Sequence, residues 1–297
     1  MEKIKWLLEA IGRFLASNYL YIAWFFVYFM LAWGLLGGGE AGFMLVLVVY
    51  SVSITIALSP IGEILLRLLE NCREPQTEVE RDYLLPLFEE AYESAKELVP
   101  SINQGIKIYI MDAMYVNAFA IGRRTIAVTR GALETFTEDE LKGILAHELG
   151  HMNYGHTKAL LLSLIGNLFF SVIIWFFRLV LNILQIATNI FAHISVIALG
   201  FAFFTFIIRI IVEASTFVFV NLSQIILALN SRTNETQADK FAHDIGYGKE
   251  LISSMYLLQK ISMNKKMRLA DRAKASHPHL AYRISKLEKL EREAVTG

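Results

Sequence analysis

The placement of apolar residues constrains this 297-residue chain more than any other feature, because they gather in four long segments. The first two, residues 19–36 and 41 to about 66, are separated by a run of three glycines. The other two are residues 159–181 and 194–229. A helix needs about 20 apolar residues to cross the hydrocarbon core of a bilayer. The pattern therefore predicts four membrane-spanning helices, paired in two hairpins.

The overall composition supports a membrane protein and excludes several other classes. Hydrophobic residues make up 55% of the chain, which is more than a soluble domain of this size would bury. The formal net charge is zero, so no basic field favours nucleic acid, and no glycine-rich phosphate-binding loop predicts a nucleotide. Cys72 is the single cysteine, which rules out an intrachain disulfide. Residues 1–18 are amphipathic without a cleavage site, and so predict a retained anchor.

Basic residues near the apolar segments predict the orientation of the chain. They flank the open side of the first hairpin, at Lys3, Lys5, Arg13, Arg67 and Arg73. The turns at 37–40 and 182–193 contain neither lysine nor arginine. Because short loops rich in lysine and arginine stay in the cytoplasm, we expect a multi-pass protein of the inner (plasma) membrane. Both termini and the polar stretches of the chain should face the cytoplasm.

The polar stretches predict a domain outside the membrane, built from two parts of the chain. Residues 1–69 form the first hairpin, 70–158 the first part of the domain, 159–229 the second hairpin and 230–297 the second part. As one helix, the last apolar segment would be about 54 Å long, against about 30 Å of hydrocarbon core. Its distal end should therefore enter the domain. Within that segment Arg209 and Glu213 can pair, either at the membrane surface or in a water-accessible cavity.

Two stretches in the first polar part predict strands. "GIKIYIMD" at 105–112 alternates apolar and polar side chains, as a half-buried strand does, and "TIAVTRGALETF" at 125–136 begins as a second strand. We expect a small antiparallel sheet, whose exposed edge could bind an extended peptide through main-chain hydrogen bonds. The expected fold is therefore mainly α, with four spans and a cytoplasmic α+β domain.

The chemistry of the chain is concentrated in the stretch "HELGH". Thr137 and Glu140 form a capping-box pattern, which predicts that a helix starts near Glu138. His147 and His151 then lie one turn apart on the same face, where both imidazoles can reach one ion at about 2.0–2.1 Å. Glu148 lies beside them and can accept a proton from a water that the ion activates. This pattern on a helix is typical of zinc hydrolases.

A catalytic zinc usually has three protein ligands and leaves one position open, so a third ligand is needed. The metzincin arrangement requires glycine at 154 and histidine at 157, but the chain has Tyr154 and Thr157. His156 would lie about 140° round a continuing helix from His151, so we expect it to have a surface or supporting role. The third ligand should therefore come from elsewhere in the chain.

The best candidate lies in "SRTNETQADKFAHD", after the second hairpin. Glu235 and Asp239 are four residues apart in this polar, helix-favouring segment. Glu235 can ligate the metal, while Asp239 accepts the free N–H of a ligand histidine and fixes its tautomer. A solvated helix start would explain the same carboxylates, but two half-motifs that face one compartment favour a shared site. His156, His243 or His279 can still tune the metal.

Four stretches, in order, resemble the HtpX-type integral membrane zinc metallopeptidases, the family that also includes the CAAX prenyl endopeptidases. They are "NAFAIG" at 117–122, "HELGH" at 147–151, "SRTNETQAD" at 231–239 and "SHPHLAYRISKL" at 276–287. The resemblance covers most of the chain and implies a zincin-like domain of the gluzincin type. It departs from the family where the usual His-Pro-Pro is His-Pro-His, and where the polar loop before "NAFA" is short.

The resemblance implies the roles of the metal-site residues. His147, His151 and Glu235 look like the ligands of one zinc ion per chain. Glu148 looks like the general base that activates water for attack on a peptide bond.

The resemblance also implies which residues contact substrate. Asn117, Ala118 and Phe119 match an edge strand that holds the substrate backbone, although an asparagine also favours turns. His277 and Arg283 match residues that approach the scissile carbonyl and could stabilise its oxyanion. A helix start before a proline is the alternative role for His277.

We therefore expect a zinc metalloendopeptidase that acts on membrane proteins or unfolded polypeptides beside the lipid bilayer. The resemblance suggests that it removes misfolded or damaged membrane proteins, in quality control or stress response, without ATP. A prenyl-protein endopeptidase is the alternative enzyme, but those relatives have more spans. A non-proteolytic membrane metal sensor is the alternative outside enzymes, although metal storage alone has no need of Glu148. The sequence leaves the oligomeric state open.

Overall fold

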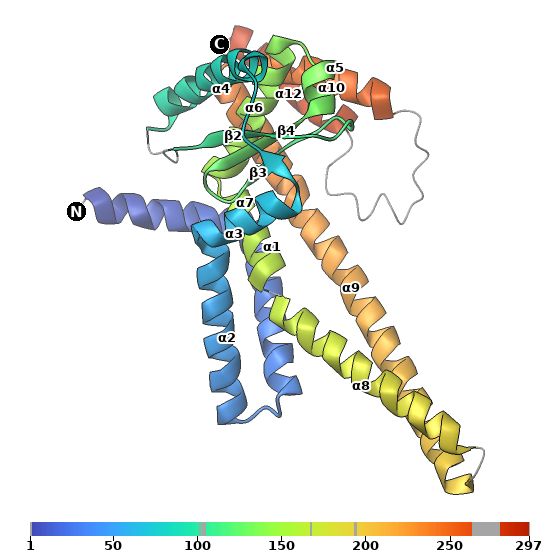
Figure 1. Ribbon diagram of the computed structural model, residues 1–297. Helices are drawn as coiled ribbons and strands as arrows, with labels where there is room; N and C mark the ends of the chain where they lie inside the picture. The colour runs from blue at the N-terminus through green and yellow to red at the C-terminus, as the bar shows by residue number, and fades with distance from the viewer. Residues whose placement is uncertain are drawn as a thin grey trace.

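The computed structural model describes residues 2–100, 102, 105–166, 168–192, 195–262 and 280–296. Helices predominate, and the described residues include one four-stranded sheet. Long helices lead away from a body that contains the sheet and several shorter helices (Figure 1). Four helical segments are long and apolar enough to cross a membrane: Phe14–Leu35, Glu40–Leu58, Ser171–Phe191 and Val196–Asp244. The prediction of four candidate spans in two hairpins is confirmed.

The first hairpin consists of α1 (Glu2–Leu35) and α2 (Glu40–Leu58). Gly37 and Gly38 have positive φ angles, which glycine adopts without strain, so the chain can reverse within a few residues. A small cluster of side chains is buried between the two helices: Ala32, Val46 and Tyr50. The glycine turn and this packing hold α1 and α2 side by side (Figure 1).

The second apolar segment does not form the single helix that the sequence suggested. α2 ends at Leu58, and α3 (Pro60–Leu69) starts a new helix. Pro60 has no N–H to donate and favours the first position of a helix. The Ser59 hydroxyl accepts a hydrogen bond from the Ile61 N–H at 3.2 Å, which caps α3. The chain therefore turns at Ser59, and α3 lies between the hairpin and the sheet (Figure 1).

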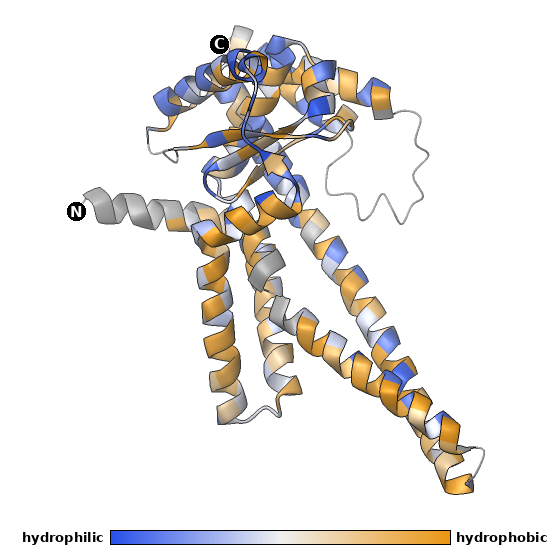
Figure 2. Ribbon diagram, viewed as in Figure 1, coloured by the Kyte–Doolittle hydropathy of each residue, from blue (hydrophilic) through white to orange (hydrophobic). Residues whose placement is uncertain are grey.

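The second hairpin follows α7 (His156–Gly166) and consists of α8 (Leu168–Ala192) and α9 (Val196–Asp244). The predicted turn at 182–193 is wrong, because α8 continues to Ala192. The third span accordingly lies later in the chain than the predicted 159–181. Most residues along both helices of this hairpin are apolar, and a few polar residues lie among them (Figure 2).

Polar side chains of α8 contact the facing helix α9. The polar stretch predicted to form a turn can therefore continue as a helix. The Gln185 amide donates to a backbone carbonyl of α9 at 3.3 Å and accepts from the Thr205 hydroxyl at 3.1 Å. Glu213 pairs across the hairpin with Arg178, with 3.0 Å between Arg178 Nε and Glu213 Oε1, whereas the sequence suggested Arg209 as its partner. Unsatisfied polar groups are costly in a bilayer, so these contacts hold α8 against α9.

α9 joins the membrane part of the chain to the body. Its 49 residues extend over about 74 Å, far more than the roughly 30 Å of a hydrocarbon core. Phe217 and Val218 are exposed, whereas Asn234, Ala238 and Phe241 are buried. The prediction that the last apolar segment continues as a helix into the polar part is confirmed.

The sheet contains β1 (Cys72–Arg73), β2 (Lys107–Met111), β3 (Ala118–Ile121) and β4 (Thr125–Thr129), in the order β1-β2-β4-β3. β1 pairs with β2, and β3 with β4, in antiparallel fashion, but β2 and β4 are parallel. The sheet is therefore mixed, and the prediction of an antiparallel sheet is wrong in this respect. β3 and β4 form a tight hairpin, and β3 lies at the edge of the sheet. The other side of β4 pairs with β2.

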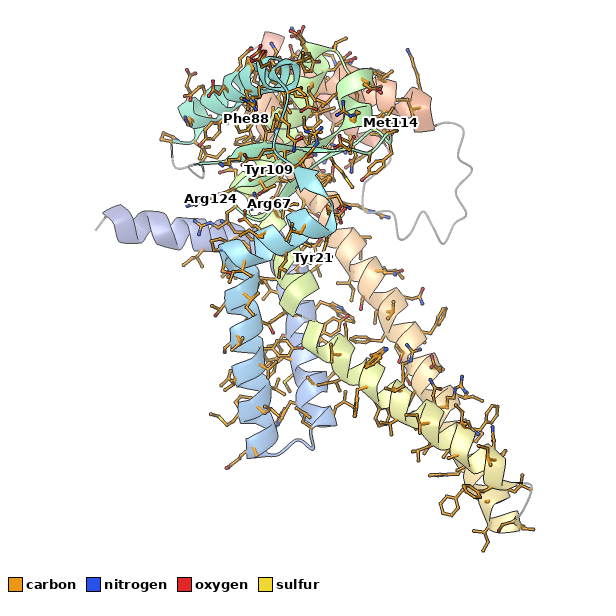
Figure 3. All side chains as sticks on the ribbon, in the orientation of Figure 1. Tyr21, Arg67, Phe88, Tyr109, Met114 and Arg124 are labelled. Carbon is orange, nitrogen blue, oxygen red and sulfur yellow. The ribbon has the colours of Figure 1, made fainter. Side chains whose placement is uncertain are left out.

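The body is packed around the sheet and α6 (Glu138–Asn153). Four more of the described helices belong to it: α4 (Glu78–Leu98), α5 (Arg130–Thr135), α10 (Gly248–Ser262) and α12 (Leu280–Thr296). One core joins these helices to the sheet and to the end of α9, and includes Phe88, Ile110, Ile126, Leu145, Phe241, Leu251 and Leu287. On the membrane side of the sheet, Arg67 of α3 donates a hydrogen bond to the Tyr109 hydroxyl and lies over its ring (Figure 3). This contact ties α3 to β2 of the sheet.

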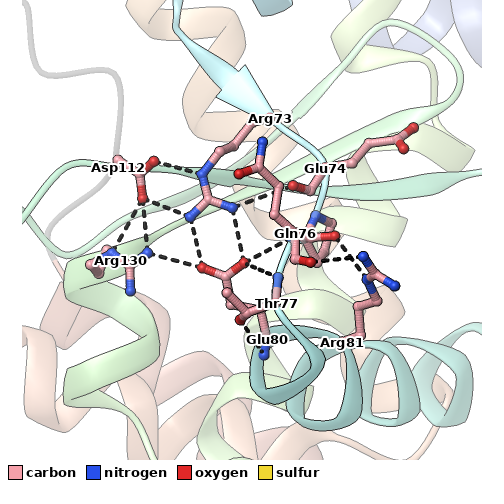
Figure 4. Close-up of polar contacts among 9 residues, drawn as sticks. Arg73, Glu74, Gln76, Thr77, Glu80, Arg81, Asp112 and Arg130 are labelled. Atoms are coloured by element: carbon pink, nitrogen blue, oxygen red, sulfur yellow. Dashed lines mark hydrogen bonds and ion pairs between the residues drawn. The ribbon is translucent and has the colours of Figure 1, made fainter.

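A cluster of ion pairs joins the ends of several elements (Figure 4). Arg73 of β1 contacts Glu80 at 2.7 Å and Asp112 at 2.6 Å. Arg130, at the start of α5, contacts the same two carboxylates at 3.0 Å. The hydrogen bonds from Arg73, followed by those from backbone N–H groups near Thr77, hold the pKa of Glu80 well below its usual value. The cluster thus ties β1 and the starts of α4 and α5 together.

Candidate metal centre

α6 brings two histidines and a glutamate into the body of the protein. Thr137 and Glu140 form the predicted capping box, so the helix begins where the sequence indicated. The Nε2 atoms of His147 and His151 lie 3.1 Å apart, and Glu148 is buried beside them. Two imidazole nitrogens at this distance need a proton or a cation between them. The pair is therefore suited to bind one positively charged species.

α9 brings Glu235 to the same point. Its Oε2 lies 3.4 Å from His147 Nε2, and its Oε1 lies 3.4 Å from His151 Nε2. The residue is only 2% exposed, and a buried carboxylate is costly unless a cation or hydrogen-bond donors compensate its charge. One ligand atom from each of the three residues lies within 4.8 Å of the others, so they can hold one metal ion. The donor set therefore fits a divalent cation.

Asp239 fixes the orientation of His147. It lies one turn beyond Glu235 on α9, and its Oδ1 is 2.9 Å from His147 Nδ1. Nδ1 is therefore the donor, and Nε2 is left to face the metal position. Burial lowers the pKa of His147, but hydrogen bonds to Asp239 and Glu235 outweigh burial and raise the pKa to about 9. A proton and a metal ion thus compete for this histidine.

Arg283 of α12 links the two carboxylates of α9. Its Nη1 lies 2.7 Å from Glu235 Oε2, and its Nη2 lies 2.6 Å from Asp239 Oδ1. Its Nε donates to Asp239 Oδ2 at 2.8 Å, so the contact with Asp239 is bidentate. This planar fork holds both carboxylates in a fixed orientation. His277, the other candidate oxyanion donor, and His279 lie outside the described residues.

His156 supports His151 and is buried. Its Nδ1 lies 3.0 Å from His151 Nδ1, and its Nε2 lies 2.9 Å from Gln237 Oε1. Burial, and next the charge of His151, lower the pKa of His156 to about 3, so the ring is neutral at physiological pH. The sequence left open whether His156 lies on the surface or supports the site. In the structure it is buried against His151, so it has the supporting role. The sequence did not indicate the role of Gln237 as a partner of His156, although Gln237 lies between Glu235 and Asp239.

The first membrane helix, α1, is kinked at Asn18 and contacts the end of α6 at this kink. The sequence did not predict this contact. Asn18 has non-helical backbone angles and is fully buried. Its amide donates to the Phe14 carbonyl at 2.9 Å and approaches the Tyr154 carbonyl at 3.5 Å. Because Tyr154 ends α6, the first membrane helix contacts the helix that carries both histidines. The available signal was an asparagine at the start of an apolar segment.

Asn117, Ala118 and Phe119 lie where β3 begins, at the edge of the sheet. The Asn117 carbonyl accepts from the Thr129 N–H at 3.0 Å, and the Asn117 N–H donates to the Thr129 hydroxyl at 3.0 Å. β3 also contacts α6. The edge strand therefore runs beside the helix that carries the two histidines.

Comparisons with known proteins relate the chain to peptidases. The profile of peptidase family M48 matches residues 88–291, which include α6 and the end of α9. The chain is 52% identical to a protease HtpX homolog of Aquifex aeolicus over 50 residues, 16% of this chain and 17% of the relative. It is 29% identical to the protease HtpX of Hahella chejuensis over 166 residues, 54% of this chain and 53% of the relative. These matches span about half or less of each relative.

Among solved structures, Ste24p of S. mikatae is similar in shape. The TM-score is 0.49 at 20% sequence identity, over 96% of this chain and 65% of that protein.

Proposed function

The chain belongs to peptidase family M48, and we propose that it is a membrane-bound zinc endopeptidase with His147, His151 and Glu235 as metal ligands. One observation carries the proposal: two imidazole nitrogens from α6 and a buried carboxylate from α9 converge within 4.8 Å. Two histidines and one glutamate are a ligand set of hydrolytic zinc sites, which keep a position open for water or substrate. A structural zinc site would have four protein ligands instead.

Glu148 is the general base in this proposal. When bound, zinc supplies Lewis acidity, which polarises a peptide carbonyl and makes a water more acidic. Glu148 is buried one residue from His147, where it can take the proton of that water and pass it to the leaving amine. Arg283, whose Nη2 lies 3.5 Å from the His147 ring, and His277 are the candidates to stabilise the oxyanion.

The proposed substrates are membrane proteins and unfolded polypeptides, especially misfolded or damaged ones. An edge strand offers main-chain groups to an extended polypeptide and makes few demands on its side chains. The ligand Glu235 lies on the same continuous helix as the last apolar segment, which supports a site close to the bilayer surface. The basic residues that flank the first hairpin support a cytoplasmic location for this site.

Zinc content and chelator-sensitive cleavage, measured on the full chain in detergent, test this function. The purified protein should contain one zinc per chain and cleave casein or a membrane protein substrate. A chelator should stop cleavage, and added zinc should restore it. The variant Glu148→Gln should keep its zinc and lose about 10²–10⁴-fold in kcat.

Two results would contradict parts of this proposal. Full activity of Glu148→Gln would remove Glu148 from the role of base. A parent chain that binds zinc but cleaves no polypeptide would favour a membrane metal sensor over a peptidase.

A further inference from the structure

β3 has one free edge among the described strands. Asn117 bonds to β4 through its N–H and C=O groups, and every second residue of an antiparallel ladder bonds to the same neighbour. Phe119 and Ile121 therefore bond toward β4 as well. The N–H and C=O groups of Ala118 and Ala120 point to the open edge, where the small side chains let another strand approach.

A cavity of about 290 Å³ lies beside this strand. Its walls come from Leu66 on α3, from Phe119 and Ile121 on β3, and from Thr157 and Leu161 on α7. Phe119 and Ile121 share the face of β3 opposite to Ala118 and Ala120, because side chains alternate along a strand. An extended peptide on the open edge would place every second side chain on the cavity side.

The walls of this cavity are tied to the turn between β3 and β4. The Glu63 carboxylate of α3 accepts hydrogen bonds from the backbone N–H groups of Arg123 and Arg124. On the other side, the Thr157 hydroxyl of α7 donates to the Gly122 carbonyl. Gly122 has a φ of +59°, and an added Cβ there would collide with the Glu63 side chain. α3, α7 and β3 are thus locked together, so the cavity is formed before a substrate binds.

The character of the cavity indicates what it would accept. Four of the walls named above are aliphatic or aromatic, and the charged residue in the lining is Glu70, which is exposed. The volume is just below the range of about 300–1,000 Å³ that holds a small-molecule ligand, and so suits one large side chain. α3 also exposes Leu65, Leu68 and Leu69, as expected of a helix at a membrane surface. A polypeptide that leaves the bilayer beside α3 would present apolar side chains here.

We propose that this cavity is a specificity subsite, which takes one large apolar side chain of a polypeptide bound to the free edge of β3. The inference rests on the proposed peptidase function and adds a side-chain preference to it. Leu66 and Leu161 act as specificity-determining residues, and Glu63 acts as a positioning residue for the strand. An acidic side chain is disfavoured at this position by the apolar walls and by the neighbouring Glu70 carboxylate.

Peptides that differ at one position test the subsite. A host peptide of alanine, serine and lysine carries a single leucine, alanine or aspartate at each position in turn. Binding is measured by fluorescence anisotropy with the zinc-loaded Glu148→Gln chain, and kcat/KM is measured with the parent. At one position, leucine should be favoured over alanine by about tenfold or more, and aspartate should be the worst.

Two substitutions on α3 separate the cavity from general effects on the fold. Leu66→Trp fills the cavity, so it should remove the leucine preference while the alanine peptide is still bound. Leu65→Trp places the same bulk on an exposed neighbour that is 44% exposed, and should leave the preference as in the parent. Because the readout is a ratio between two peptides, a partly unfolded variant does not mimic the result.

The outcomes distinguish this inference from the function on which it rests. An unchanged leucine preference in Leu66→Trp, or none in the parent, would overturn the subsite while cleavage by the parent still supports the peptidase. A leucine preference in binding, lost in Leu66→Trp, without cleavage of any peptide by the parent would support the subsite and refute the peptidase.

Discussion

The two helices that carry the proposed metal ligands, α6 and α9, are built in opposite ways. α6 has 16 residues, most of which are buried in the core of the body. α9 has 49 residues, and its apolar first part is mostly exposed, while the turns that carry Glu235 and Asp239 are buried. The difference implies that α6 sets where the metal binds. α9 is positioned against α6 by the contacts of its last, buried turns.

The crossing of α6 and α9 depends on two small residues. A Cβ added at Gly150 would lie 2.9 Å from the Cα of Ala238 and 3.0 Å from the Cβ of Phe241, so only glycine permits this approach. Gly150 immediately precedes His151, and Ala238 immediately precedes Asp239. The close approach of the two backbones is therefore what brings Glu235 within reach of both histidines.

The largest expected effect comes from removing a ligand on either side of the crossing. His151→Ala, on α6, and Glu235→Ala, on α9, should each reduce the zinc content from one per chain to near zero and abolish cleavage. Each leaves two protein ligands where a catalytic zinc normally has three. Metal analysis after dialysis checks this. The matched control is Glu291→Ala, which removes a carboxylate 2.8 Å from His243 at the end of α9 and should leave the zinc in place.

A smaller effect is expected when the support of a ligand is removed. Asp239→Asn removes the negative charge beside His147 and replaces one of the two oxygens that His147 and Arg283 share by an NH₂ donor, so the zinc affinity should fall by about 10–100-fold. Competition with a chromogenic chelator measures this affinity. An affinity equal to that of the parent would mean that α6 orients His147 without help from α9.

The two glycines of α6 offer the sharpest comparison between packing and metal binding. A Cβ added at Gly143 would lie 2.5 Å from the backbone N of Leu251 on α10, closer still than the 2.9 Å contact of a Cβ at Gly150 with α9. Both Gly143→Ala and Gly150→Ala should cost about 1–3 kcal/mol of stability through overpacking. Only Gly150→Ala should also weaken zinc binding, because it displaces Glu235. Thermal unfolding and zinc titration measure the two effects, and an equal loss of zinc affinity in both variants would contradict the role given to the crossing.

The smallest effect is expected far from the crossing, in the ion-pair cluster around Glu80. The lowered pKa means that the ionised carboxylate stabilises the folded state. This contribution is complete above the unfolded pKa of about 4.5 and is lost as the pH falls toward the lower folded pKa. Glu80→Gln should therefore lower the midpoint of thermal unfolding by a few degrees at pH 7, and by less at pH 4. Zinc affinity should stay as in the parent, and a loss of zinc would show that the cluster also positions α6.

The sequence predicted α6 in detail because all its signals are local. The capping box at Thr137 and the histidine spacing each lie within one helix, so the periodicity of a helix is enough to interpret them. The four spans and the long reach of α9 also followed from length and composition. The resemblance to the HtpX-type peptidases was confirmed by the comparisons.

What the sequence missed depends on contacts between elements. The parallel pairing of β2 with β4 cannot be predicted from alternation, which gives only the buried face of each strand. Gln185 looked like part of a turn because its partners on α9 were unknown. The supporting contacts of Gln237 and of the Asn18 kink arise only when three helices meet, and no local pattern indicates them.

X-ray absorption at the zinc edge of the loaded protein tests the central claim most directly, because it reports the atoms around the ion. The account predicts nitrogen and oxygen neighbours at about 2.0–2.2 Å, with two imidazoles, and the loss of one oxygen neighbour in any zinc that Glu235→Ala retains. Three imidazoles, which would make His156 a ligand, or a spectrum that Glu235→Ala leaves unchanged, would contradict it.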